Sequence, residues 1–278
     1  MLTARALKSL LREHDLRLTK RLGQHYLVDA RIVRQVVEAC ELSEKDRVIE
    51  IGAGLGALTE PLAQRAARVL AIEVDRGVCQ VLQPRLAAWP NVQVVCQDAL
   101  QWDWARAESC VVVGAIPYSI TSPLLVSLCE HRSVIQRAIL IVQREVADRL
   151  LAAPGTKAYG RLSVLGQYFW QIAPVMTVRR HAFFPQPSVD STCLKLLPRE
   201  IPAGAVQDEQ LLFSVVKAAF AHRRKSLVNC LMDVHGLALE RSQAEQGVRA
   251  LGLPLTIRGE ALSIQQFTLL ADALRRTN

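Results

Sequence analysis

The sequence predicts an α/β fold in which a first domain contains a parallel sheet and a smaller second domain is helical. Short β-branched runs alternate with segments of helical spacing from Asp46 onward, as in proteins with helices on both faces of a parallel sheet. After a linker at 198–204, only helical patterns remain. Hydrophobic residues make up 50% of the 278 residues, which provides enough apolar surface for a large core. We therefore expect residues 1–200 to form the sheet domain and residues 201–278 the helical domain.

Each expected element follows from a local pattern. Five strands are rich in β-branched residues and lie at 47–51, 69–74, 92–96, 110–113 and 138–142. A further strand, at 189–197, shows alternation after a turn that contains Pro185 and Pro187. Helical spacing occurs at 58–68, 79–88, 143–152, 161–170, 210–221, 225–233, 241–251 and 264–275. The basic N-terminus has leucines at helical spacing, which predicts an amphipathic helix that packs on the domain or touches a partner.

Composition argues against several classes of protein. The formal net charge of +8 and the pI of about 9.4 favour a polyanionic partner such as nucleic acid. The cysteines are scattered without a Cys-x-x-Cys pair, which argues against a zinc ribbon or a disulfide framework and is typical of a reducing cytoplasm. The histidines lack the spacing of metal ligands, so no metal site is expected. No apolar run reaches the roughly 18 residues of a membrane span, and the N-terminus lacks the apolar core of a secretory signal.

A glycine-rich turn follows the first expected strand and indicates a nucleoside-binding site. Gly52 and Gly54 let the backbone pass close to a ligand. Glu73 ends the next strand, where a carboxylate can accept from both ribose hydroxyls, and Asp98 follows the third, where it can accept from an adenine amine. The alternatives are a plain turn, a solvated Glu73 and an Asp98 that caps a helix. These residues do not separate NAD from S-adenosyl-L-methionine, but the glycine spacing is shorter than in dinucleotide folds and favours the latter.

The turn after the fourth expected strand points to methyl transfer. Its sequence, Ala115-Ile116-Pro117-Tyr118, resembles the (Asn/Asp)-hydrophobic-Pro-Tyr motif of methyltransferases that modify the exocyclic amine of adenine. That amine is a weak nucleophile because its lone pair is delocalised into the ring. Oxygens that accept from its N–H groups favour a pyramidal nitrogen, and an aromatic face such as that of Tyr118 can stack the flipped base. We expect these four residues to form a catalytic turn, with Ala115 also beside the cofactor.

Further motifs extend the resemblance from Leu22 to the C-terminus. Segments typical of one family occur at 22–29 (LGQHYLVD), 158–164 (AYGRLSV), 183–191 (FFPQPSVDS) and 220–231 (FAHRRKSLVNCL). The chain thus resembles the KsgA family of small-subunit ribosomal RNA adenine N6-dimethyltransferases. The resemblance implies a Rossmann-like domain that binds S-adenosyl-L-methionine. It also implies dimethylation of two adjacent adenines near the 3′ end of 16S rRNA, in a pre-30S or 30S particle, by a cytoplasmic monomer.

The resemblance and the charge pattern assign roles to further residues. Gln24, Tyr26 and Leu27 are expected to line the cofactor pocket, and Phe183 to sandwich the target adenine opposite Tyr118. Basic clusters beside these segments are expected to bind RNA phosphates. They comprise Arg179, Arg180, His222, Arg223, Arg224 and Lys225, with Arg17, Lys20 and Arg21 as further candidates.

One residue departs from the family's pattern, because Ala115 stands where the motif has Asn or Asp. Loss of that acceptor would cost about 2–4 kcal/mol in the transition state, roughly 10²–10³ in rate. The chain is then a slow enzyme, an engineered inactive variant, or a non-catalytic factor that binds pre-small subunits. Erm-type methyltransferases of large-subunit rRNA share the fold and the turn, but the segments at 159–164 and 223–229 favour the small-subunit family.

Overall fold

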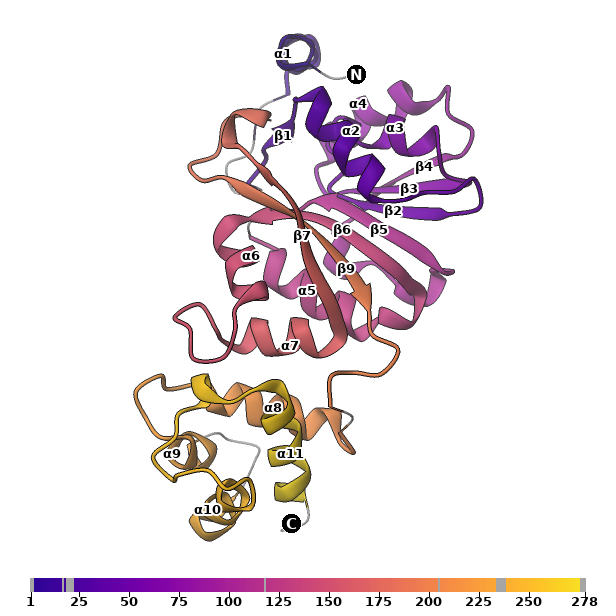
Figure 1. Ribbon diagram of the computed structural model, residues 1–278. Coiled ribbons are helices and arrows are strands. Elements are labelled where there is room, and N and C mark those ends of the chain that lie inside the picture. Colours follow the sequence, from indigo (N-terminus) through magenta and orange to yellow (C-terminus); the bar gives the residue numbers. More distant parts are fainter. Residues whose placement is uncertain are drawn as a thin grey trace. The chain divides into compact units, whose positions relative to one another are not determined.

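The computed structural model describes residues 3–16, 18, 23–117, 119–204, 206–233 and 239–275, which belong to two compact units (Figure 1). The sheet unit comprises residues 1–147 and 172–198, and the helical unit comprises residues 148–171 and 199–278. The second stretch of the helical unit begins at residue 199, near the expected boundary at residue 200. The unit also includes residues 148–171, which the sequence pattern assigned to the first domain. Within the described residues, no helix is both long enough and apolar enough to cross a membrane.

The sheet unit is built on seven strands in the order β4-β3-β2-β5-β6-β9-β7. Their bounds are β2 Arg47–Ile51, β3 Arg68–Glu73, β4 Val92–Cys96, β5 Cys110–Ala115, β6 Ile135–Gln143, β7 Trp170–Val178 and β9 Ser191–Pro198. All neighbouring pairs from β4 to β6 are parallel, as predicted, whereas β9 joins β6 in the antiparallel direction. Figure 1 shows the central strands β2, β3, β5 and β6 side by side. Parallel order brings the carboxyl ends of these strands to one edge.

Helices and short turns connect these strands. The helices are α1 Ala4–Glu13, α2 Ala30–Ala39, α3 Thr59–Ala63, α4 Arg76–Leu86, α5 Thr121–Glu130 and α6 Arg144–Leu151. Short 3₁₀ helices occupy Ala99–Gln101, Trp104–Arg106, Arg132–Val134 and Arg180–Ala182 in this unit, and Gly259–Ala261 in the helical unit. The expected helix at 58–68 is shorter in the structure, because the chain already enters strand β3 at Arg68.

Elements of the sheet unit that are absent from the sequence-based expectation include α2, α5 and β7. Strand β7 is the clearest case, since it carries Pro174 in its middle and exposes most of its residues. A proline removes a ladder hydrogen bond and is tolerated at the edge of a sheet, which is where β7 lies. Its sequence therefore lacks the pattern of an inner strand.

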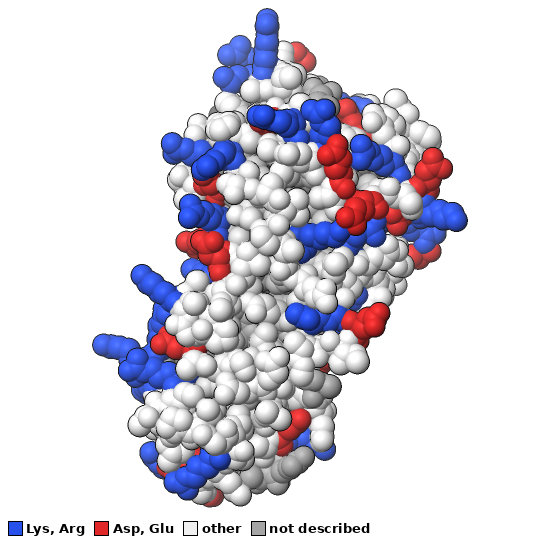
Figure 2. Space-filling model, viewed as in Figure 1, with Lys and Arg blue, Asp and Glu red and all other residues white. Residues whose placement is uncertain are grey.

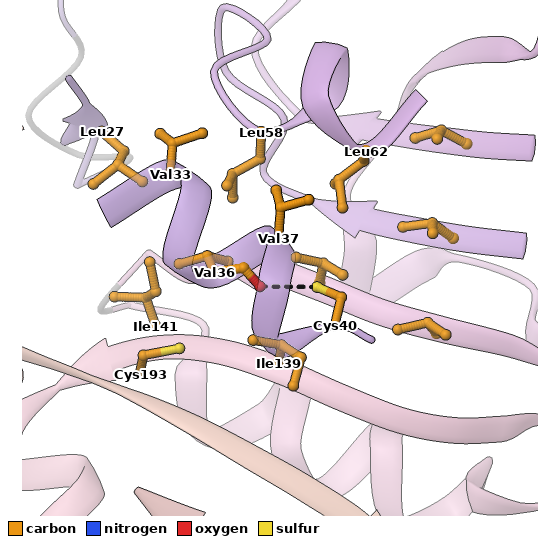
Figure 3. Close-up of a cluster of buried hydrophobic side chains, with 14 of the residues drawn as sticks. Leu27, Val33, Val36, Val37, Cys40, Leu58, Leu62, Ile139, Ile141 and Cys193 are labelled. Carbon is orange, nitrogen blue, oxygen red and sulfur yellow. Dashed lines mark hydrogen bonds between the residues drawn. The ribbon is translucent and has the colours of Figure 1, made fainter. Parts of the chain in front are cut away.

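Helix α2 shows how the core of this unit forms. Asp29 caps the helix by accepting hydrogen bonds from the backbone of Arg31 and Ile32. Its buried face, Val33, Val36 and Val37, packs over side chains from α3, β6 and β9, as Figure 3 shows. Burial of each such valine contributes about 1.5–3 kcal/mol, so this face, rather than helix propensity, orders the ten-residue helix.

The helical unit contains α7 Arg161–Phe169, α8 Glu209–Ala219, α9 Leu227–Met232, α10 Arg241–Ala250 and α11 Ile264–Arg275. Aromatic contacts join its two stretches of chain. The Tyr159 hydroxyl donates to the Leu262 carbonyl at 2.9 Å, and the rings of Tyr168 and Phe169 both pack against Phe213. These contacts explain why residues 148–171 group with the C-terminal helices.

Candidate functional site

One pocket in the sheet unit collects most of the residues predicted to act on cofactor or base. It lies where β2, β3, β4 and β5 end. The predicted residues that line it are Gln24, Tyr26, Leu27, Gly52, Gly54, Glu73, Asp98, Ala115, Ile116, Pro117 and Phe183. Tyr118 lies outside the described residues. The convergence follows from topology, because parallel strands bring their carboxyl ends to the same edge of the sheet.

The glycine loop after β2 approaches its neighbours too closely for side chains. Gly54 has a φ of +56°, and a Cβ there would lie 2.9 Å from the Tyr26 ring. Gly52 has a φ of +74° and donates its N–H to the carbonyl of Ile72 on β3. Gly54 needs glycine because it combines left-handed backbone with close approach, whereas Gly52 needs glycine for its left-handed backbone alone. The loop therefore presents bare backbone to the pocket.

Glu73 is a buried carboxylate at the end of β3 that holds this loop. Its Oε2 accepts from the Gly54 N–H at 2.8 Å, and its Oε1 accepts from the Asp75 N–H at 3.0 Å. Burial raises the pKa of Glu73, and these backbone hydrogen bonds act in the opposite direction. Each carboxylate oxygen has a second lone pair. Glu73 can thus accept two further hydrogen bonds from vicinal hydroxyls.

Two other predicted residues line the pocket and also have local structural partners. The Gln24 amide donates to Asp75 Oδ2 at 2.8 Å, which joins the segment before β1 to the N-cap of α4. Asp98 accepts from the Leu100 N–H at 2.9 Å and caps a 3₁₀ turn. The cap anticipated as the alternative for Asp98 is therefore present, and Asp98 lines the pocket as well.

Glu50 is a pocket residue that sequence reasoning did not select. It precedes the glycine loop, is fully buried, and its Oε2 has no hydrogen-bond partner among the described residues. Burial raises the pKa of Glu50 to about 8, and the neighbouring charge of Glu73 adds to the shift. The signal that could have identified Glu50 is a carboxylate near the end of a mostly apolar expected strand, two residues before Gly52. His25 also lines the pocket, with its Nδ1 2.7 Å from the Pro185 carbonyl oxygen.

The candidate catalytic turn is held by backbone hydrogen bonds. Ile116 N–H donates to the Ile141 carbonyl at 3.0 Å, and the Pro117 carbonyl accepts from the Ile120 N–H and the Thr121 hydroxyl. Glycine is also required at position 114, just before Ala115, because a Cβ there would lie 2.4 Å from the Ile51 oxygen. The turn is therefore rigid on both sides of Ala115, whose methyl group offers no hydrogen-bond acceptor.

A two-stranded sheet forms the wall beside this turn. Strands β1 (Tyr26–Leu27) and β8 (Phe183–Phe184) pair in the antiparallel direction, with Leu27 opposite Phe183. Phe183 is buried and lines the pocket. Two distant motifs of the sequence thus meet at one wall.

The predicted RNA-binding residues come from both units of the chain. Arg179 and Arg180 belong to the sheet unit, and residues 222–225 to the helical unit. Arg179 forms an ion pair with Asp190 at 2.9 Å, and Arg223 forms one with Glu260 at 2.9 Å. The pKa of Asp190 is lowered by hydrogen bonds from the Arg180 backbone and the Arg179 side chain. Arg17, Lys20 and Arg21 lie outside the described residues.

Asp233 is the partner of two more of the predicted RNA contacts. It pairs with Lys225, and His222 Nε2 lies 3.7 Å from the same carboxylate. The Lys225 ammonium lowers the pKa of Asp233. On the face drawn in Figure 2, Lys and Arg side chains alternate with Asp and Glu. For the part of the chain that is described, no group of His, Cys, Asp and Glu side chains is arranged to hold a metal ion.

The pocket fits the nucleoside part of S-adenosyl-L-methionine. Bare backbone at Gly52 and Gly54 provides the close approach, and Glu73 keeps free acceptor capacity for a ribose diol. Asp98 stands beyond β4 as a second acceptor, and the remaining wall is mostly apolar. These residues would hold the ribose and the adenine.

Comparisons with known proteins agree with this geometry. The sequence profile of the family described as "Ribosomal RNA adenine dimethylase" matches residues 16–250. A ribosomal RNA small subunit methyltransferase A from Syntrophus aciditrophicus is 42% identical over 273 residues, which covers 96% of this chain and 98% of the relative. One from Streptococcus equi subsp. zooepidemicus is also 42% identical, covering 97% of this chain and 96% of the relative.

Two solved structures share the fold at lower identity. A dimethyladenosine transferase from Plasmodium falciparum superposes with a TM-score of 0.77 at 26% identity, covering 88% of this chain and 96% of that one. The 23S rRNA methyltransferase ErmE gives a TM-score of 0.67 at 28% identity, covering 90% of this chain and 99% of that one. The predicted Rossmann-like methyltransferase fold is confirmed, and S-adenosyl-L-methionine is the cofactor of these enzymes. The chain belongs to the family of ribosomal RNA adenine dimethylases.

Proposed function

We propose that this rRNA adenine dimethyltransferase methylates N6 of two adjacent adenines near the 3′ end of 16S rRNA. The substrate is a pre-30S or 30S particle, and the enzyme acts as a monomer in the cytoplasm. The observation that carries the proposal is the convergence of the glycine loop, Glu73, Asp98 and the Ala115–Pro117 turn on one pocket. The small-subunit names of the relatives at 42% identity support the 16S substrate over a large-subunit one.

The residues of this chain bind and orient the reactants. When bound, S-adenosyl-L-methionine supplies an electrophilic methyl group on a sulfonium. Glu73 would accept from the ribose hydroxyls and Asp98 from the adenine amine of the cofactor, while Tyr118 and Phe183 would hold the flipped target base. Gln24, Tyr26 and Leu27 complete the wall of this pocket. In-line placement dominates such a reaction, because no acid or base needs to act before the methyl group moves.

The backbone of the catalytic turn would supply one acceptor for the target amine. The Pro117 carbonyl already accepts from the Ile120 N–H and the Thr121 hydroxyl. The acceptor role therefore falls to the Ile116 carbonyl. The second acceptor of the family motif is the side chain that Ala115 lacks.

Ala115 favours a second candidate function. A chain without the amide oxygen would lose about 2–4 kcal/mol of transition-state stabilisation, or roughly 10²–10³ in rate. Cofactor binding at Glu73 and Asp98 would remain. The alternative is therefore a weak or inactive methyltransferase that acts as a small-subunit assembly factor.

The test compares the chain that carries Ala115 with its Ala115→Asn variant. Undermethylated small subunits receive labelled methyl groups from S-adenosyl-L-methionine, and the labelled adenines are mapped. We expect slow transfer to two adjacent adenines by the chain with Ala115 and a faster rate, by about 10²-fold, for Ala115→Asn. Transfer by the variant alone, with small-subunit binding by both, would establish the assembly factor. Label in large-subunit rRNA instead would overturn the 16S proposal.

A further inference from the structure

Helix α1 packs on the outside of the cofactor pocket. Thr3 caps the helix by accepting from the Ala6 N–H at 3.2 Å, and Leu7 on its apolar face is 0% exposed. A helix of ten residues is marginal on its own in water, so contacts with the rest of the unit must order it.

Leu7 belongs to a small buried cluster, separate from the core under α2. We call it the α1 cluster, and its members are Leu7, Tyr26, Leu55, Val78 and Val81. The partly buried side chains of Leu10, Leu11 and Phe184 pack against this cluster. The cluster thus joins α1 to the glycine loop, to α4 and to both strands of the β1–β8 sheet.

Two members of the α1 cluster face the pocket as well. Tyr26 and Leu55 both line it. The Tyr26 ring occupies the space beside Gly54, where a Cβ would lie 2.9 Å from the ring, and the Gly54 N–H donates to Glu73. Leu7 and Tyr26 thus belong to one buried cluster, the Tyr26 ring lies beside Gly54, and the Gly54 N–H donates to the carboxylate that would bind the ribose.

A second contact reaches the wall that would hold the target base. The Lys8 ammonium lies 5.0 Å from the centroid of the Phe184 ring, a cation–π distance. Phe184 pairs with Tyr26 across the β1–β8 sheet, and the next pair is Leu27 with Phe183. Helix α1 thus covers the outer side of the sheet whose inner side lines the pocket.

We propose that helix α1 is a positioning element for the cofactor pocket, and that Leu7 and Lys8 are its positioning residues. Neither residue lines the pocket. Their effect on S-adenosyl-L-methionine passes through Tyr26 and the glycine loop. Loss of α1 packing should weaken cofactor binding and leave the turnover of the saturated enzyme nearly unchanged.

Binding of S-adenosyl-L-methionine to the full chain without RNA, measured by calorimetry, tests this inference. We expect Leu7→Ala to raise the Kd about tenfold and Leu7→Met to restore it, because methionine refills a leucine site. Lys8→Gln, which removes an exposed charge without a core cavity, should raise the Kd about twofold. Hydrogen exchange at residues 52–56 should accelerate in Leu7→Ala.

Leu212→Ala serves as the matched control. Leu212 is buried in α8 of the helical unit and lines no part of the pocket, so its truncation should lower stability without raising the Kd. An unchanged Kd in Leu7→Ala and Lys8→Gln, or an equal rise in Leu212→Ala, would overturn the inference. Failure of the unsubstituted chain to bind S-adenosyl-L-methionine would instead refute the cofactor assignment and, with it, the inference.

Discussion

The cofactor pocket and the basic clusters differ in how their predicted residues are arranged. In the pocket, residues from distant motifs meet at one edge of one sheet, and several are buried. The basic residues are divided between two units and pair with nearby carboxylates such as Asp190, Glu260 and Asp233. Strand topology brings the first group together, whereas no single element brings the second group together. Functional residues at the ends of parallel strands are thus easier to locate from a sequence than functional residues on the surface.

The largest expected effect of a single substitution lies beside the pocket, at Gly114. In Gly114→Ala, the new Cβ would lie 2.4 Å from the Ile51 oxygen and 2.8 Å from the Ile116 side chain. Both neighbours belong to the strand ends that form the site, so the backbone must shift. We expect a loss of about 3 kcal/mol in the free energy of unfolding, measured with urea.

Gly160→Ala is the matched control in the helical unit. Nothing lies within 4 Å of a Cβ at Gly160, and its backbone is extended with a φ of −169°. Because Gly160 is the N-cap of α7 and glycine is preferred to alanine there, Gly160→Ala should lower the free energy of unfolding by about 1 kcal/mol. Equal losses in the two variants would show that the pocket edge is no more constrained than the helical unit.

The next effect concerns cofactor affinity. Glu73→Gln replaces an oxygen that accepts from a backbone N–H with an amide that donates. We expect the Kd for S-adenosyl-L-methionine to rise about a hundredfold, or about 2.7 kcal/mol, in a calorimetric titration. Asp272→Asn is the control, since Asp272 also accepts from a backbone N–H, that of Gln207, but lies outside the pocket. Unchanged affinity in Glu73→Gln would remove Glu73 from the ribose site.

A buried carboxyl also predicts how stability depends on pH. The pKa of Glu50 is raised from 4.5 to about 8 by burial, so between these values the folded protein holds a proton that the unfolded chain releases. Its stabilising contribution is complete below pH 4.5 and is lost as the pH rises toward 8. The steepest decline is about 1.4 kcal/mol per pH unit for one proton.

Glu73 contributes in the same direction, because its pKa is also raised by burial. Glu50→Gln should flatten the decline in a series of urea titrations between pH 5 and about 8. The exposed Glu44 provides the control, and Glu44→Gln should leave the slope unchanged. A stability that rises over this window would contradict the buried neutral Glu50.

The smallest effect is expected at the basic residues of the helical unit. Changing Arg223, Arg224 and Lys225 together to Glu should weaken binding to small subunits about fivefold and flatten its dependence on salt. The measurement is affinity at several salt concentrations. Arg241 and Arg249 changed together to Glu, both paired with Glu245 on α10, form the control. An unchanged salt dependence in the first variant would exclude this cluster from the RNA interface.

The sequence was most informative where local patterns and topology agree. Strands β2 and β4 have the predicted bounds, and Gly52, Glu73 and Asp98 line one pocket as parallel order requires. Strand β7 could not be predicted from its sequence. Its position at the edge of the sheet permits Pro174 and leaves most of its residues exposed, so the alternation of buried and exposed residues that marks a strand is missing. Glu50 was missed for a related reason, since burial and an unpaired oxygen exist only after folding. The ion pairs of Arg179 and Arg223 likewise depend on residues distant in sequence.

The inclusion of residues 148–171 in the helical unit has a consequence for proteolysis. The chain passes between the two units three times, near residues 147, 171 and 198. A protease that cuts at one crossing leaves the covalent chain intact at the other two. The hydrogen bond from Tyr159 to Leu262 joins the two stretches of the helical unit, and the pairing of β6 with β9 joins those of the sheet unit. A single nick should therefore yield one particle on a native gel and two fragments under denaturing conditions. The RNA-modifying machinery of this enzyme cannot be separated into halves by one cleavage.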